Sequence, residues 1–216
     1  MFAMMQRITS LLLILVSFSA IASNNPPNAL FGYKESPRSN LGLFPQWLSV
    51  LERHIEEMTP EGQCDATEFN RCHMREWRSF LRSISHMDAD TQIRMVNGYA
   101  NKKEYVLDIE NYGINDYWAS PRQFLHNNGD CEDYAIIKMM SLKQLGFSKD
   151  KMRVVVVQDT NQRIAHAVMS IARSNDILIL DNQIEEVISH RDIFHYVPVY
   201  SVNESSWWMH LPNGDD

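Results

Sequence analysis

Residues 127–145 read NNGDCEDYAIIKMMSLKQL, and this stretch decides the fold. The opening NNG is typical of a turn, and Asp130 is an aspartate, a residue type whose side chain often caps helix N-termini. The apolar residues after Cys131 recur at helical spacing up to Leu145, and Gly146 stands where a helix-ending glycine belongs. The stretch therefore predicts a helix that begins at Cys131 and carries the thiol on its first turn.

Three strands are predicted after this helix. Residues 153–158 (RVVVVQ) have the composition of a strand buried on both faces, residues 164–172 alternate, and residues 177–180 return after a tight turn. One helix followed by an antiparallel meander predicts an α+β fold in which the helix packs on the sheet.

The first half of the chain is predicted to be helical. Apolar residues at helical spacing indicate helices over 45–58, 69–84 and 89–102, and Asp88 is expected to cap the last of them. Residues 105–107 suggest a short strand. Residues 111–129 are rich in Gly, Asn, Asp and Pro and are interpreted as a long loop, a kind of segment that is often functional.

The predicted register brings a histidine and an aspartate together. If the turn pairs Ala172 with Ile177, Asp181 lies opposite Val168, and His166 is its diagonal neighbour on the same face. A nucleophile at a helix start, with an imidazole oriented by an acid, is the arrangement of Cys-His-Asp acyl transfer. A buried structural thiol and an ordinary core histidine are the alternative interpretations of the same residues.

The imidazole, more than the helix, is expected to make the thiolate. A helix N-terminus contributes about 0.3–1 kcal/mol, whereas an imidazolium about 4 Å away contributes about 4 kcal/mol at an effective dielectric of about 20. Asp130, Glu132 and Asp133 oppose the thiolate, because negative charges raise the pKa of the Cys131 thiol. A positive group is therefore expected near this acidic cluster.

The N-terminus has the pattern of a secretory signal peptide. Arg7 is followed by the apolar run LLLILVSF at residues 11–18 and then by small residues at Ala20 and Ala22. A buried helix and a retained anchor are the alternatives. The expected organisation is a signal peptide over 1–22 cleaved after Ala22, a flexible leader over 23–40, and one periplasmic domain over 41–216. No transmembrane segment is expected after cleavage, and the net charge of −7 argues against nucleic-acid binding.

The chain contains three cysteines, an odd number. In an exported protein this count predicts one disulfide and one free thiol. Cys64 and Cys72 are the expected pair, which would stabilise the fold by roughly 2–3 kcal/mol and leave Cys131 free. A zinc site made of Cys64, Cys72 and His73 is an alternative that lacks a convincing fourth ligand.

Several blocks of sequence resemble a known family. GDCEDYA at 129–135 is preceded by DYWASP at 116–121 and followed by AHAV at 165–168 and LDNQ at 180–183. Together they closely resemble the bacterial transglutaminase-like cysteine proteinases, whose best-known branch is the LapG-type periplasmic proteases. The resemblance implies a papain/transglutaminase-like fold, with Cys131 as nucleophile, His166 as general base and acid, and Asp181 as the orienting residue.

The same resemblance implies a cofactor and partners. In LapG-type members the acids that flank the nucleophile, here Asp130 and Glu132, coordinate Ca²⁺, and Asp116 is a weaker candidate ligand. Because residues two apart in a regular helix do not share a face, the two flanking acids converge only if the first turn is bent. First-turn acids favoured by the helix dipole are the alternative interpretation. LapG-type proteases cleave large surface adhesins and so control biofilm attachment, and an inner-membrane receptor sequesters them.

Three functions are therefore carried forward. The first is an exported cysteine peptidase that acts through a thioester acyl-enzyme on a protein substrate. The second is a transglutaminase or amidase with the same triad, and the third is a binding module that retains the fold without catalysis.

Overall fold

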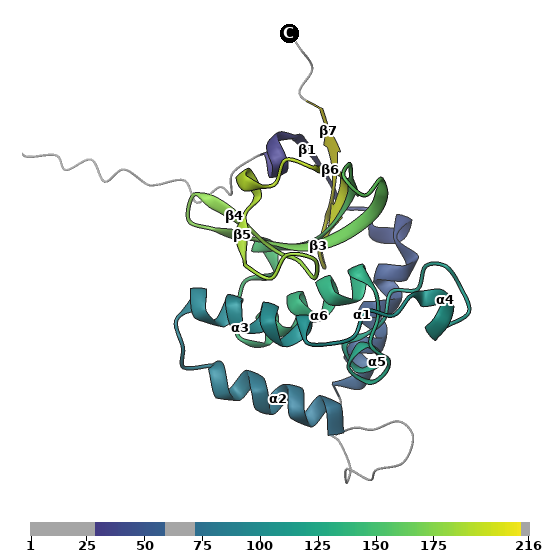
Figure 1. Ribbon diagram of the computed structural model, residues 1–216, viewed down its shortest axis with the longest axis vertical. Coiled ribbons are helices and arrows are strands. Elements are labelled where there is room, and N and C mark those ends of the chain that lie inside the picture. Colours follow the sequence, from purple (N-terminus) through teal and green to yellow (C-terminus); the bar gives the residue numbers. More distant parts are fainter. Residues whose placement is uncertain (1–28, 59–71, 213–216) are drawn as a thin grey trace, which may run out of the picture.

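The computed structural model describes residues 29–58 and 72–212. These residues form a seven-stranded antiparallel sheet with the order β1-β7-β6-β2-β3-β4-β5, and Figure 1 shows the helices gathered on one side of it. The strands are β1 (Lys34–Arg38), β2 (Met152–Asp159), β3 (Ile164–Arg173), β4 (Asp176–Leu180), β5 (Ile188–Ser189), β6 (Tyr196–Val202) and β7 (Trp207–Leu211). The helices are α1 (Pro45–Glu57), α2 (Cys72–Ile84), α3 (Ala89–Asn101), α4 (Asp108–Asn111), α5 (Pro121–Asn127) and α6 (Cys131–Gln144). The predicted α+β class is confirmed.

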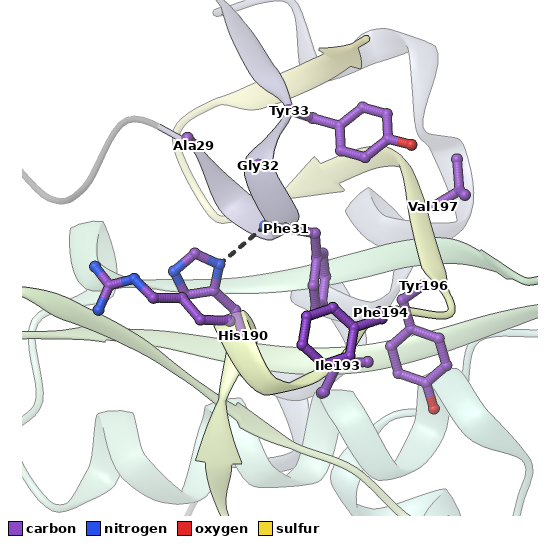
Figure 2. Close-up of a pocket in the computed structure, with 10 residues that line it drawn as sticks. Ala29, Phe31, Gly32, Tyr33, His190, Ile193, Phe194, Tyr196 and Val197 are labelled. Carbon is purple, nitrogen blue, oxygen red and sulfur yellow. Dashed lines mark hydrogen bonds between the residues drawn. The ribbon is translucent and has the colours of Figure 1, made fainter. Parts of the chain in front are cut away.

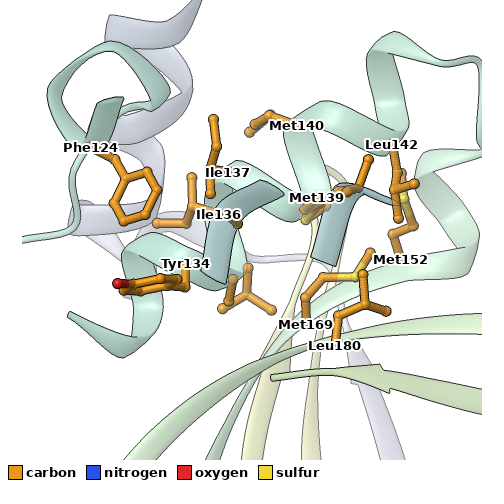
Figure 3. Packing of buried hydrophobic residues seen from close by; sticks show 14 of the residues in the cluster. Phe124, Tyr134, Ile136, Ile137, Met139, Met140, Leu142, Met152, Met169 and Leu180 are labelled. Carbon is orange, nitrogen blue, oxygen red and sulfur yellow. The ribbon is translucent and has the colours of Figure 1, made fainter. Parts of the chain in front are cut away.

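The helix that starts at Cys131 is α6, and it lies at the centre of the larger core. Its apolar side chains pack between the other helices and the sheet, as Figure 3 shows for Met139 and Leu142 beside Met152, Met169 and Leu180. The chain leaves the helix at Gly146, whose φ of +93° favours glycine. The end predicted from the sequence is therefore confirmed.

The sheet is buried on both faces. The sequence indicated this for residues 153–158 but not for residues 164–172. A second apolar cluster covers the face away from α6 and includes Val155, Val168, Ile179 and Tyr196. Residues 164–172 were expected to alternate, but the middle of β3 is buried at every position from His166 to Ile171. The alternation is lost because both faces of this strand pack against apolar residues.

Helices α1, α2 and α3 form close to their predicted positions. Asp88 caps α3 as expected, since its side chain accepts a hydrogen bond from the Thr91 N–H at 3.0 Å. The strand expected at 105–107 is reduced to a single bridge between Tyr105 and Gly129.

The segment expected to be a loop, 111–129, contains helix α5. Ser120 and Gln123 form a capping box at its start, and Pro121 occupies the first helical position. The Ser120 hydroxyl also donates to the Glu57 carboxylate, which ties α5 to the end of α1. A loop interpretation based on Gly, Asn, Asp and Pro content missed this Ser-Pro helix start.

The flexible leader expected over residues 23–40 is also corrected. Residues 34–38 form β1 and pair antiparallel with β7, and Leu30 is buried. The domain therefore includes residues N-terminal to the predicted boundary at 41. The pairing works because β7 is long enough to offer a partner for every residue of β1.

Some predictions fall outside the described residues. The signal peptide over 1–22 lies there, and so does Cys64, so that the Cys64–Cys72 disulfide and the zinc alternative stay predictions. Cys131 is free, as the disulfide prediction requires. Within 29–58 and 72–212, no helix is long and apolar enough to cross a membrane.

Candidate active site

Cys131 is the first residue of α6, and its Sγ donates a hydrogen bond to Oε2 of Glu132 at 3.2 Å. Burial raises the pKa of the Cys131 thiol well above its ordinary value, and the carboxylates of Glu132 and Asp130 raise it further. The backbone N–H of Ala167 lowers that pKa through a hydrogen bond, which places the sulfur against β3. The acidic neighbours therefore oppose a thiolate, as the sequence predicts.

His166 and Asp181 form a buried pair. The register of β3 and β4 pairs Ala172 with Ile177, as predicted, and brings Nε2 of His166 within 2.9 Å of Oδ1 of Asp181. Each of these two side chains is 1% exposed. Asp181 follows directly after the last residue of β4, so the strand fixes where its carboxylate lies.

Three further groups hold the Asp181 carboxylate. The backbone N–H of Gln183 donates to Oδ1 at 2.9 Å, and the Tyr196 hydroxyl donates to Oδ2 at 2.7 Å. The side-chain amide of Asn101, at the end of α3, donates to the Asp181 carbonyl at 2.8 Å. Burial acts to raise the pKa of Asp181, but the hydrogen bonds from His166, Gln183 and Tyr196, together with the charge of the His166 ring when it is protonated, bring that pKa below its usual value.

The thiol and the His166–Asp181 pair belong to the same site. Ala167, whose N–H reaches the sulfur, is the next residue after His166 in β3. Tyr196 is close to both, because its ring centroid is 5.6 Å from that of His166 and the charge of Cys131 contributes to its raised pKa, after burial and Asp181. The structure thus brings the three predicted residues together from α6, β3 and the end of β4.

A cluster of carboxylates lies beside the thiol. Oxygen atoms of Asp108, Asp116 and Glu132 lie within 4.8 Å of one another, and so do those of Asp108, Asp130 and Asp133. Asp130 occupies the N-cap position of α6, but its side chain makes no capping hydrogen bond, contrary to the expectation. Its backbone is extended and outside the helix, and this is why it can converge with Glu132 although only two residues separate them.

The cluster has the chemistry of a hard cation site. Oδ1 of Asp108, Oδ1 of Asp130 and Oδ2 of Asp133 are buried and have no hydrogen-bond partner among the described residues. Burial, followed by the neighbouring charges, raises the pKa of Asp130, Glu132 and Asp133, and burial raises the pKa of Asp108 to about 6. Buried carboxylates without partners are costly unless a cation or proton compensates them. Such oxygens fit Ca²⁺, which binds carboxylates preferentially.

Sequence reasoning missed two members of this cluster. Asp108 begins the short helix α4, far from the nucleophile in sequence, and no fixed spacing relates it to Cys131. Asp133 was recognised among the acids beside the thiol but not as a candidate metal ligand. Its Oδ1 accepts from the Ala119 N–H at 2.6 Å, which ties the DYWASP segment to α6. Asp116 is the exposed member, and its carboxylate accepts from the side chains of Gln46 and Trp118.

A cavity of about 470 Å³ lies near the site but does not contain it. Figure 2 shows its lining, which includes Phe31, His190, Phe194 and Tyr196. None of the three predicted catalytic residues lines it. Tyr196, whose hydroxyl donates to Asp181, also lines the cavity, which therefore adjoins the second core.

Comparisons with known proteins agree with this geometry. The family model for bacterial transglutaminase-like cysteine proteinases matches residues 62–216. Among similar solved structures are three of LapG from Legionella pneumophila, each 27% identical with a TM-score of 0.60 and covering 74% of this chain. The match covers 87% of the LapG chain in one structure and in its calcium-bound form, and 84% in an EGTA-treated form. No curated protein matches the chain.

Proposed function

The chain belongs to the bacterial transglutaminase-like cysteine proteinase family, and from this premise we propose that Cys131, His166 and Asp181 are its catalytic triad. Membership makes the protein a cysteine peptidase with a protein substrate. The observation that carries the residue assignment is the buried His166–Asp181 pair, whose Nε2 and Oδ1 atoms are 2.9 Å apart, with His166 on the strand whose next N–H reaches the Cys131 sulfur.

The triad supports acyl transfer through a thioester. The thiol proton moves from Cys131 to Nδ1 of His166, and the sulfur attacks the substrate carbonyl carbon. The C–S bond forms as the C–N bond breaks, and the imidazolium gives its proton to the leaving amine. The same ring then takes a proton from water, whose oxygen attacks the thioester and releases the second product together with the thiol.

Asp181 orients the base in this scheme. A carboxylate only accepts hydrogen bonds, so the hydrogen between Nε2 and Oδ1 belongs to His166. The neutral ring then has its lone pair on Nδ1, the nitrogen that receives the thiol proton. The two other donors to Asp181, from Gln183 and Tyr196, hold its carboxylate in that orientation.

The start of α6 offers donors for the developing oxyanion. The first N–H groups of a helix have no partner within the helix, and the Asp130 side chain does not cap them. A substrate carbonyl oxygen that gains negative charge near Cys131 is stabilised by such groups.

We further propose that the acidic cluster holds Ca²⁺, with Asp108, Asp116, Asp130 and Glu132 as its ligands. The ion would supply positive charge that offsets the carboxylates opposing the thiolate. The unpartnered oxygens support this proposal, and so does the calcium-bound state of the similar LapG structure.

The triad is tested by alkylating the full chain with iodoacetamide in the presence of calcium. We expect Cys131 to react at neutral pH, and His166→Ala to lower the rate by at least about tenfold, since the histidine makes the thiolate. His195→Ala is the matched control, because His195 packs against Tyr196 without touching Asp181. Equal rates for His166→Ala and the wild type would refute the assignment.

The acceptor of the acyl group is tested on a protein substrate with an added primary amine. Mass spectrometry distinguishes cleavage, which adds water, from cross-linking to the amine. Cleavage supports the peptidase, whereas an amine adduct favours the transglutaminase reaction. A Cys131 that stays unreactive towards iodoacetamide in the presence of calcium would favour the binding module.

We propose that the enzyme works in the periplasm, after removal of residues 1–22, on a surface adhesin and under an inner-membrane receptor. The signal-peptide pattern and the family likeness support this proposal. N-terminal sequencing of the secreted chain should begin at Ser23. A chain that keeps Met1 would contradict export by this route.

A further inference from the structure

The second nitrogen of the His166 ring has a partner that the triad does not account for. Nε2 is bonded to Asp181, and the side-chain Nε2 of Gln183 lies 3.3 Å from Nδ1. In the neutral ring Nε2 carries the hydrogen, so that Nδ1 is an acceptor and the Gln183 amide is the donor. The lone pair required for general-base catalysis is therefore already hydrogen-bonded.

The other end of the Gln183 amide also has a partner. Its Oε1 accepts a hydrogen bond from Nε2 of Gln162 at 2.5 Å. Gln162 lies in the turn between β2 and β3, which the buried carboxylate of Asp159 holds by accepting from the Asn161 and Gln162 N–H groups. With its oxygen turned to Gln162, the Gln183 amide presents N–H to the imidazole.

This orientation has a chemical consequence. An amide N–H stabilises the neutral ring and cannot accept a hydrogen from protonated Nδ1. The Nδ1 lone pair points in one direction, so the Cys131 thiol and the Gln183 amide are alternative donors to it. In this structure the thiol donates to Glu132 instead. Both partners of the proposed proton transfer are thus hydrogen-bonded to other groups.

We propose that Gln183 is a positioning residue for the base, which donates to Nδ1 of His166 and favours the ring form with its lone pair there until the thiol replaces the amide. The inference rests on the proposed function, because it takes His166 as the base. Gln183 is free to withdraw, since its anchor Gln162 is exposed. The titratable groups that contact the ring are Asp181 and Tyr196, and the Cys131 thiol lies against the next residue of β3, Ala167.

The test observes the ring itself. In the full chain labelled with ¹⁵N-histidine, the nitrogen shifts report both the tautomer and the protonated share of His166, assigned by comparison with His166→Gln. We expect the wild type to carry its hydrogen on Nε2. In Gln183→Met, which has similar length but no donor, the protonated share near neutral pH should rise about three- to tenfold, the ratio that one ordinary hydrogen bond sets.

A graded series separates this role from packing. Gln183→Glu keeps the shape and supplies an acceptor to protonated Nδ1, so it should raise the protonated share further than Gln183→Met. Gln162→Ala removes the partner of the Gln183 amide, so its protonated share of His166 should lie between those of the wild type and Gln183→Met. Gln158→Met is the control, because Gln158 lies on the strand that leads into the same turn and its side chain donates to the Asp159 carbonyl, away from the His166 ring.

Two results would overturn the inference: a wild-type ring with its hydrogen on Nδ1, or identical ring signals in the wild type and Gln183→Met. A result that refutes the proposed triad would differ from these two results. In that case, His166→Ala would leave the alkylation of Cys131 unchanged, whatever the Gln183 variants do to the ring.

Discussion

Lys138 is the residue whose position is least expected from the sequence. It lies within α6 and is 0% exposed, and its Nζ has no hydrogen-bond partner among the described residues. The ring of Tyr134 lies 5.8 Å from Nζ, and the charge of Asp181 partly offsets the burial. Burial nevertheless lowers the pKa of Lys138 from 10.5 to about 7. The ammonium is therefore a source of instability within the catalytic helix.

Replacing this lysine should stabilise the fold in a pH-dependent way. The lowered pKa means that the folded state binds fewer protons than the unfolded state, so the cost is full below about pH 7 and disappears as pH rises towards 10.5. Lys138→Met should add up to about 5 kcal/mol to the unfolding free energy at pH 6, and much less at pH 10. Urea titrations at both pH values measure the gain in unfolding free energy. Lys149→Met, at an exposed lysine, is the control. A gain that does not shrink with pH would contradict the explanation.

Gly129 shows why a glycine precedes the nucleophile block. A Cβ at this position would lie 2.1 Å from Oδ2 of Asp133, closer than any real contact. Gly129→Ala should displace Asp133 from the Ala119 N–H and lower stability by about 2–3 kcal/mol. Gly98→Ala in α3 is the control, since its Cβ meets nothing within 4 Å and should stabilise the helix by about 0.5–1 kcal/mol. Thermal melts compare the two, and a harmless Gly129→Ala would show that the close approach is not needed.

At the scale of elements, α5 connects the first helix to the nucleophile. Ser120 is completely buried and serves both the cap of α5 and the carboxylate of Glu57. Ser120→Ala removes both hydrogen bonds and leaves a buried carboxylate poorly satisfied, so we expect a loss of about 2–3 kcal/mol. Ser83→Ala, an exposed serine of α2, should change stability by less than about 0.5 kcal/mol. Denaturant midpoints test the difference, and similar values for both variants would contradict the dual role.

Elements with local signals were predicted well from the sequence. The start of α6, its end at Gly146 and the cap at Asp88 each depend on residues a few positions apart. The register that pairs His166 with Asp181 also follows from a local turn. By contrast, β1 pairs with β7, which lies more than 160 residues later in the sequence. No local pattern in residues 34–38 predicts that partner.

The candidate site divides in the same way. The triad residues stand in local motifs, so the sequence could propose them, whereas Asp108 joins the acidic cluster only through the tertiary fold. The bond between Gln183 and the His166 ring depends equally on the turn that holds Gln162. Groups that contact the triad only through the tertiary fold could therefore be identified only from the structure.

For the whole molecule, the acidic cluster couples stability to pH and to calcium. Burial raises the pKa of Asp108 from 3.8 to about 6, so the folded state holds this proton more tightly than the unfolded state. The associated stability is present at low pH and is lost as pH rises through about 6. Calcium-free protein should therefore lose about 1–2 kcal/mol from this group between pH 4 and pH 7, after allowance for solvent screening.

Calcium should oppose this loss, because the ion binds the deprotonated carboxylates of the folded state. We expect added calcium to raise the melting temperature at pH 7 much more than at pH 4, where protons compete for the same oxygens. Asp108→Asn should weaken the calcium effect and make the calcium-free protein more stable at pH 7, while the exposed Asp150→Asn changes neither. Melting curves with calcium and with chelator measure both effects. Superimposable curves at pH 7 would mean that the cluster binds no calcium, and a calcium gain undiminished by Asp108→Asn would remove this residue from the ligand set.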